Sequence, residues 1–242
     1  MKSVKKRLAE GRCQGIGPTY VPFILVEEAR SIGTATRIPD PIEGRDVHTL
    51  STVETMLYWY IRWDTNVLHI REQFLMDMGL VNDIRDELGL GLTGSYYTTD
   101  FLVDYKDRTQ RAYSVKWTKN VFDPENRAYR GREGRYASLI NRQYLEKLYW
   151  DSKGVDFRIV TREQLDRKYA ANIEFAMSYY TELSVVNTHH KLMYLIAHHI
   201  IDVPMDQGYL NPAKLLRESR VDIDTTYALA LRLKEEARRI DL

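Results

Sequence analysis

Two strand-like segments joined by a short linker constrain the fold of this chain more than any other feature. Thr98–Tyr105 and Arg111–Thr118 both have strand character, and Lys106–Gln110 between them has the length and turn chemistry of a hairpin. Amphipathic helices are predicted before and after this hairpin, at Ser51–Trp63 and Ala137–Lys153. A hairpin bracketed by helices predicts an α/β domain in which a sheet is flanked by helices.

The remaining elements of this first domain are predicted with the same rules. Val21–Glu28, Val67–Phe74 and Val155–Thr161 have strand character, and Leu80–Leu92 is predicted to be a glycine-punctuated loop or a short helix. Residues 1–50, apart from the first of these strands, are rich in glycine and proline and are predicted to be irregular.

After about Leu165 the pattern changes to helices only. We therefore place a domain boundary there, with one domain at 1–166 and a small all-α domain at 167–242. The last two predicted helices are separated by a six-residue link with Asp224 as the expected N-cap, which resembles a helix-turn-helix; a plain helical interaction bundle is the alternative. The four helices are expected at Lys168–Leu183, Thr188–Ile201, Pro212–Glu218 and Thr225–Ile240.

Composition excludes several classes of protein. The 242 residues carry a net charge of +1, and Cys13 is the only cysteine, which excludes an internal disulfide and a cysteine-based zinc site. No run of apolar residues is long enough to span a bilayer, and no secretory signal is present, so we expect a protein of a reducing, cytosolic compartment.

Three charged residues on the predicted elements form a candidate nuclease site. Glu54 lies on the first helix, Asp100 on the first hairpin strand, and Lys116 on the second, two residues after Ser114 and on the same face. Phosphodiester hydrolysis needs hard oxygen ligands for Mg²⁺ and a cation beside the attacked phosphate. The two carboxylates and the lysine would supply them.

Each member of this set also has a structural interpretation. Ser51–Glu54 matches a capping box, in which Glu54 would only cap its helix. Asp100 is a disfavoured residue in a strand, although an aspartate at the entry to a turn is an alternative. Lys116 on a half-exposed strand is ordinarily just solvated. The combination is more specific than any single member.

A basic segment follows the candidate site. Residues 106–147 contain eleven Lys and Arg against five Asp and Glu, with six aromatic residues interleaved. Such a segment is suited to a phosphate backbone, whereas an ordinary solvated face is the alternative. The expected DNA contacts are Lys119, Arg127, Arg130, Arg132 and Arg135.

Several longer motifs resemble the TnsA family, the endonuclease subunits of heteromeric cut-and-paste transposons. The resemblance runs from about residue 5 to residue 162, and beyond it only the helical character is similar. The motifs that carry it are Glu10–Gly15 with Tyr20–Pro22, Gly44–His48 with Leu50, Ser51 and Glu54, Val67–Phe74, Thr99–Asp104, and Leu145–Trp150.

The resemblance implies a restriction-endonuclease-like fold for the first domain, and for the second a helical, winged-helix-like domain that contacts partner proteins and DNA. It implies cleavage of the non-transferred (5′) strands at transposon ends, in double-stranded DNA, together with a TnsB-type transposase and a TnsC-type AAA ATPase. It also implies a Mg²⁺ cofactor, for which Mn²⁺ would substitute. The implied site residues are Glu54, Asp100 and Lys116, with the Val115 backbone carbonyl and Glu146 as further metal ligands.

One position departs from the family. The family has glutamine, and related nucleases have Asp or Glu, where this chain has Ser114, whose hydroxyl is a shorter and weaker ligand. Two rival interpretations therefore remain: a stand-alone restriction or repair nuclease, and a non-catalytic assembly subunit in which Ser114 marks decay of the site.

Overall fold

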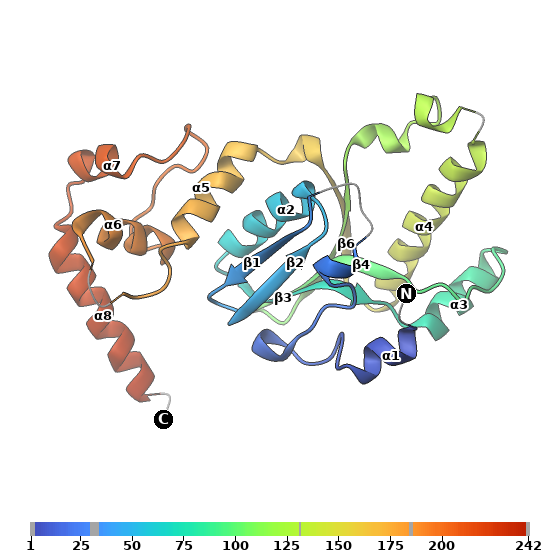
Figure 1. The fold of residues 1–242 in the computed structure, drawn as a ribbon, viewed down its shortest axis with the longest axis horizontal. Helices are drawn as coiled ribbons and strands as arrows, with labels where there is room; N and C mark the ends of the chain where they lie inside the picture. The colour runs from blue at the N-terminus through green and yellow to red at the C-terminus, as the bar shows by residue number, and fades with distance from the viewer. Residues whose placement is uncertain (1–2, 30–33, 131, 184–185, 241–242) are drawn as a thin grey trace. The chain divides into compact units, whose positions relative to one another are not determined.

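The computed structural model describes residues 3–29, 34–130, 132–183 and 186–240 (Figure 1). The chain divides into two compact units, Met1–Leu165 and Asp166–Leu242. Among the described residues no helix is both long and apolar enough to cross a bilayer.

A four-stranded mixed sheet forms the centre of the first unit. Its order is β3 (Val67–Leu75), β4 (Thr98–Tyr105), β5 (Gln110–Lys116) and β6 (Asp156–Thr161). The first three strands are antiparallel, and β6 runs parallel to β5 after the crossover through α4 (Glu133–Ser152). The predicted hairpin and the predicted α/β class with a mixed sheet between helices are confirmed.

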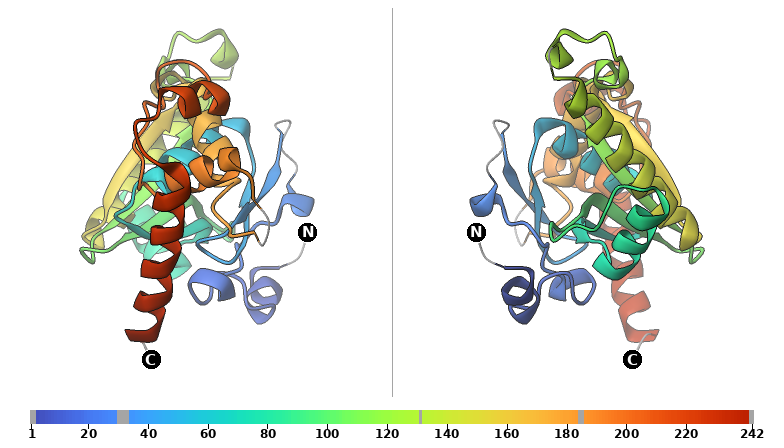
Figure 2. Two further views of the ribbon diagram at one scale, coloured as in Figure 1. Left: turned by 90° about the vertical axis from the view of Figure 1, so that its left-hand side faces the viewer. Right: turned by 90° about the vertical axis from the view of Figure 1, so that its right-hand side faces the viewer.

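Helices cover both faces of this sheet (Figures 1 and 2). On one face, α3 (Met78–Glu87) and α4 pack a core cluster that includes Leu102 of β4 and Trp150 of α4. Helix α2 (Thr52–Trp63) contacts β5 and β2. Successive residues Phe101, Leu102 and Val103 are all buried, as expected for a strand covered on both faces.

The first fifty residues are more regular than the sequence predicts. A two-stranded antiparallel sheet forms from β1 (Thr36–Asp40) and β2 (Arg45–Thr49), and α1 (Val4–Ala9) precedes it. The carboxylate of Asp40 accepts the N–H groups of Ile42 and Glu43, which tightens the turn between the strands. The predicted strand at Val21–Glu28 is wrong, because that segment is irregular and contains only the short 3₁₀ helix η2 (Val26–Glu28).

Besides η1 (Gly17–Thr19) near the start of the chain and η2, the described residues of the first unit contain three more 3₁₀ helices. Two of them, η3 (Lys119–Phe122) and η4 (Arg127–Tyr129), lie in the basic segment between β5 and α4 and contact α4. The third, η5 (Arg162–Gln164), follows β6 and ends the unit.

The second unit contains only helices among its described residues. They are α5 (Arg167–Met177), α6 (Thr188–Ala197), α7 (Pro212–Glu218) and α8 (Ile223–Ile240). Helix α6 packs against the other three, and its buried face includes Leu192, Leu195 and Ile196. The predicted N-cap at Asp224 is wrong: the carboxylate of Asp222 accepts the N–H of Thr225, so the helix begins two residues earlier than predicted. The predicted first helix is also too long, since α5 ends at Met177.

Candidate active site

Asp100 lies where the β4–β5 ladder opens. The regular pairing of the two strands reaches Phe101 opposite Tyr113 and goes no further toward Asp100. There the Asp100 carboxylate itself accepts the N–H of Val115, at 2.6 Å from Oδ2. The aspartate that is disfavoured in a strand thus replaces a ladder bond with a side-chain bond.

Lys116 and Ser114 lie on one face of β5, as predicted. The Lys116 ammonium donates to the Ser114 hydroxyl at 2.7 Å and to the Val115 carbonyl at 3.1 Å. Ser114 is 2 % exposed, so its hydroxyl is committed to holding the lysine. Lys116 thus donates hydrogen bonds to both oxygens on β5 that the sequence suggests as metal ligands, the Ser114 hydroxyl and the Val115 carbonyl.

Glu54 is both a helix cap and a neighbour of Asp100. Its Oε1 accepts the Ser51 hydroxyl at 2.8 Å and its Oε2 accepts the Leu50 N–H at 2.9 Å, while Ser51 Oγ accepts the N–H of Glu54. This is the capping interpretation that the sequence left open. Burial, together with the negative charge of Asp100, raises the pKa of the Glu54 carboxyl to about 7.

Glu146 is the third carboxyl near Asp100. It lies on α4, is 2 % exposed, and accepts the Thr99 hydroxyl at 2.7 Å. Thr99 in turn accepts the indole N–H of Trp150 at 2.8 Å. Burial raises the pKa of Glu146 to about 7, again with a contribution from the charge of Asp100, which the charge of Lys116 partly offsets.

The site therefore gathers three carboxyls and one ammonium from four elements. Helix α2 supplies Glu54, β4 supplies Asp100, β5 supplies Lys116 and α4 supplies Glu146. Negative charge from Asp100 disfavours ionisation of both glutamates, so a bound cation would relieve a repulsion that the fold builds in. Hard carboxylate oxygens suit Mg²⁺ or Mn²⁺, and by donor chemistry the residues fit such an ion.

The carboxyls are not assembled as a ligand set. Among the described residues, no three His, Cys, Asp or Glu side chains stand close enough together to hold a metal ion. Each carboxyl is turned to protein donors: Glu54 to its helix cap, Asp100 to Val115, and Glu146 to Thr99. Binding of a cation would have to displace some of these bonds.

Two buried glutamines contact the glutamates, and sequence reasoning did not find them. The Gln73 amide on β3 donates to Glu54 Oε2 at 3.3 Å, and the Gln143 amide on α4 donates to Glu146 Oε2 at 3.4 Å. They are 3 % and 5 % exposed, respectively. The available signals were a polar residue in a predicted strand for Gln73 and the spacing of three residues from Glu146 for Gln143.

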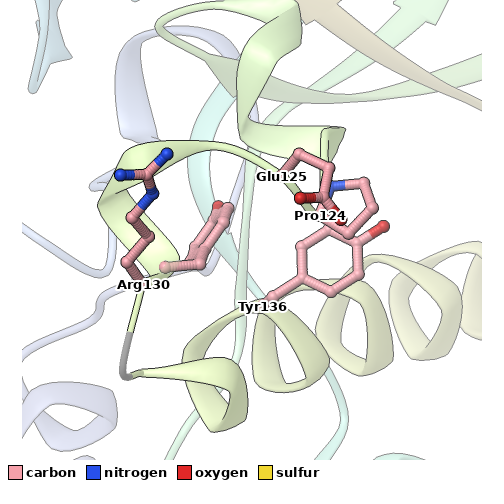
Figure 3. A pocket seen from close by; sticks show the side chains of 5 residues that line it. Pro124, Glu125, Arg130 and Tyr136 are labelled. Atoms are coloured by element: carbon pink, nitrogen blue, oxygen red, sulfur yellow. The ribbon is translucent and has the colours of Figure 1, made fainter.

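The predicted DNA contacts lie together in the segment between β5 and the start of α4. Lys119, Arg127, Arg130, Arg132 and Arg135 are all exposed, and none forms an ion pair within the described parts of the chain. A pocket of about 390 Å³ opens beside them (Figure 3), lined by Pro124, Glu125, Tyr129, Arg130 and Tyr136. Tyr129 and Tyr136 meet edge to face, and their hydroxyls donate to the carbonyls of Val121 and Phe122, which fixes both rings.

Comparisons with known proteins agree with the motifs. Residues 64–162 match the family model described as the TnsA-like endonuclease N-terminal domain. The chain is also 28 % identical to the transposon Tn7 transposition protein TnsA of Escherichia coli over 234 residues. The aligned region covers 94 % of this chain and 78 % of that protein. Both matches confirm the resemblance to TnsA-type endonucleases. The family model includes Asp100, Lys116 and Glu146, whereas Glu54 precedes it.

Proposed function

We propose that this chain is the DNA endonuclease subunit of a heteromeric transposon, of the TnsA type. It cleaves the non-transferred (5′) strands at transposon ends in a divalent-metal-dependent reaction, within an assembly that includes a TnsB-type transposase and a TnsC-type ATPase. The observation that carries this proposal is the group of carboxyls around Asp100, with Lys116 on the adjacent strand.

Roles for the residues follow from their chemistry. Asp100, Glu54 and Glu146 would hold the metal ion, with the Val115 carbonyl as a further oxygen. When bound, Mg²⁺ supplies positive charge and Lewis acidity at the scissile phosphate. Lys116 lies beside Ser114 and offsets the negative charge that develops on the phosphate oxygens during attack. A neutral Glu54 or Glu146 would hold a proton at its Oε atom until the cation favours ionisation.

The decisive experiment is a nicking assay on transposon-end DNA in Mg²⁺, with and without the transposase and the ATPase. Asp100→Ala should abolish cleavage and leave the fold intact. Asp104→Asn is the matched control. Asp104 lies on the same strand, but its carboxylate accepts hydrogen bonds from Arg71 and Gln110 and is not one of the three carboxyls of the candidate site. Unchanged nicking by a folded Asp100→Ala protein would contradict the proposal.

The same assay separates the rival functions. A stand-alone nuclease would cut without partners, and a non-catalytic assembly subunit would support transposition without cutting. Ser114 is the observation that keeps the second rival open, because its hydroxyl is engaged by Lys116 rather than available to a metal. Glu54→Gln adds a further test: glutamine retains the capping geometry, so only a ligand role predicts loss of cleavage.

We also propose that the exposed basic segment binds the DNA backbone without sequence preference. Each lost phosphate contact should reduce the dependence of log K on log salt by about one. Arg130→Ala with Arg132→Ala should therefore lower the slope by about two, whereas Lys147→Ala on α4, whose ammonium is paired with Asp151, should leave it unchanged. A double variant with the wild-type slope would contradict DNA contact by this segment.

For the helical unit at 167–242 we propose docking of the partner proteins. Its exposed large apolar side chains include Tyr209, Leu229 and Leu233, which are 67 %, 55 % and 58 % exposed. Large apolar side chains this exposed on a small unit suit a protein interface.

A further inference from the structure

We infer that Gln73 is a positioning residue that holds the Glu54 carboxylate against Asp100 in the nuclease site. The inference rests on the proposed function, and it adds a residue to which neither the motifs nor the comparisons give a role. Gln73 acts through Glu54 rather than on the metal or the DNA.

The backbone of Gln73 is the first observation. Its φ is +49°, in the left-handed region that residues with a Cβ rarely adopt. It lies within β3, between the pairs Glu72–Phe101 and Phe74–Thr99, so its position in the register is opposite Asp100. A non-glycine residue held in this conformation inside a strand, directly across from a candidate ligand, points to a functional constraint.

The N-terminal segment holds this conformation in place. The N–H of Phe23 donates to the Gln73 carbonyl at 3.3 Å, and the N–H of Leu75 donates to Cys13 Sγ at 3.3 Å. The Tyr20 hydroxyl donates to the Glu72 carbonyl at 2.8 Å. The backbone groups of residues 72, 73 and 75 are therefore bonded to residues that lie some fifty to sixty positions earlier in the chain.

The result of this conformation is the contact between the Gln73 amide and Glu54 Oε2. The other donors to Glu54, Ser51 and Leu50, belong to the start of its own helix and fix the carboxylate only relative to α2. Gln73 is the donor that comes from the sheet. It therefore fixes the distance between a carboxylate carried by α2 and one carried by β4.

An amide suits this role better than a charged group. It donates one N–H to the carboxyl group and brings no charge of its own, so it orients Glu54 without competing electrostatically with a cation. Outer partners of this kind orient ligands, and their loss ordinarily lowers metal affinity about 10- to 100-fold.

The Gln73→Asn variant tests the role of the amide separately from that of the backbone conformation. Asparagine tolerates the left-handed region but is one methylene shorter, so Gln73→Asn keeps the backbone and withdraws the amide from Glu54. Gln73→Gly, which adopts positive φ freely, removes the amide entirely. Gln110→Asn is the matched control, because Gln110 makes the same kind of bond, to Asp104 at 2.6 Å, in the same sheet.

Two quantities are measured. Electron paramagnetic resonance gives the Mn²⁺ affinity of the full chain without DNA, and the assembled reaction gives the Mg²⁺ concentration at half-maximal nicking, called the Mg²⁺ midpoint below. For Gln73→Asn and Gln73→Gly we expect affinity to fall at least tenfold and the Mg²⁺ midpoint to rise by a similar factor. Thermal stability should stay close to wild type, and excess Mg²⁺ should restore nicking. Gln110→Asn should match wild type in every measurement.

Two results would overturn the inference. Wild-type affinity and midpoint in both Gln73 variants would mean that the amide does not position Glu54. Reduced maximal activity with a lowered melting temperature, unchanged Mn²⁺ affinity and an unchanged Mg²⁺ midpoint would assign Gln73 a purely structural role. The proposed function fails separately: in that case wild-type protein and Asp100→Ala would be equally inactive and would bind Mn²⁺ equally.

Discussion

The two units of this chain are stabilised by different interactions. In the unit at 1–165, ion pairs with little exposure join the N-terminal elements to their neighbours: Arg45 of β2 with Glu72 of β3 at 2.8 Å, and Arg62 of α2 with Asp40 of β1 at 2.8 Å. In the unit at 166–242, Asn172 is the only buried polar side chain among the described residues, and ion pairs such as Lys234 with Glu182 are partly exposed.

This difference matches what each unit is proposed to do. Buried ion pairs contribute little net stability, but their directional bonds favour one arrangement and strongly disfavour others. Arg45, for example, donates to both oxygens of Glu72 and to the carbonyl of Ile70, which fixes β2 against β3. Such fixed geometry suits a site in which carboxyls from several elements must meet. A unit that docks partners needs apolar surface more than rigid geometry, and the helical unit exposes it.

The largest expected effect is loss of one buried ion pair. Arg62 donates to Asp40 at 2.8 Å and to Glu43 at 3.1 Å, and all three side chains are buried. Arg62→Met should cost about 3–5 kcal/mol, because two carboxylates remain buried without their cation. Lys147→Met, which breaks the exposed pair with Asp151, should cost less than about 0.5 kcal/mol. Chemical denaturation measures both, and equal costs would contradict the contrast between buried and exposed pairs.

In the helical unit the corresponding variant is Asn172→Asp. The Asn172 amide donates to the carbonyls of Met205 and Gly208 and accepts the N–H of Leu210, which ties the chain after α6 to α5. Aspartate has the same shape but lacks the two donors, so we expect a cost of about 1–3 kcal/mol. Hydrogen exchange should show faster opening at residues 205–210 than in the sheet. Uniform destabilisation of both units would mean that they do not unfold independently.

The arrangement of the first unit was largely predictable because its signals are local. The hairpin, α2 and β6 follow from periodicity and turn chemistry, and the capping box at Ser51 has the bonds that its pattern predicts. The predicted strand at Val21–Glu28 is wrong because an apolar run does not reveal whether a neighbouring strand is available to pair with it. β1 was missed because Pro39 and Asp40 look like turn residues, although Pro39 is tolerated in a two-stranded sheet.

The site was predictable only in part. Asp100 and Lys116 are proposed from residue type and spacing, whereas Glu146 is proposed from the resemblance alone. Gln73 and Gln143 were missed because their contacts depend on how α2 and α4 pack on the sheet. The positive φ of Gln73 is imposed by residues far away in the chain, and no local pattern encodes it.

The two units should also respond to pH in opposite directions. In the first, Glu54 and Glu146 have pKa values raised to about 7, above the value of 4.5 for a free glutamate. Their contribution to stability is present below pH 4.5 and is lost as pH rises through 7. In the second, burial lowers the pKa of His198 and of His199 below 6.5, so their contribution is present above pH 6.5 and is lost as pH falls.

Hydrogen exchange in EDTA at pH 5.5 and pH 8, corrected for intrinsic rates, resolves the two trends. Between these values the opening free energy of α2 and β4 should fall by about 1–3 kcal/mol, while that of α6 should rise. His48, whose pKa burial lowers, opposes the trend in the first unit, so the comparison is made with Glu54→Gln combined with Glu146→Gln. If that double variant retains the full decrease, the glutamates are not its cause.

The smallest effect on stability is expected on the exposed face of α8. Leu229 and Leu233 are one turn apart, and both are more than half exposed, so replacing them with serine should change the free energy of unfolding by less than about 0.5 kcal/mol. If this face docks a partner, the double variant should nonetheless lose cleavage in the assembled reaction while retaining the fold. Leu192→Ser, at a buried position on α6, is the contrasting variant and should unfold the unit. Full activity of the Leu229→Ser, Leu233→Ser protein with its partners would exclude α8 as the docking face and leave Tyr209 and the segment around it as the next surface to test.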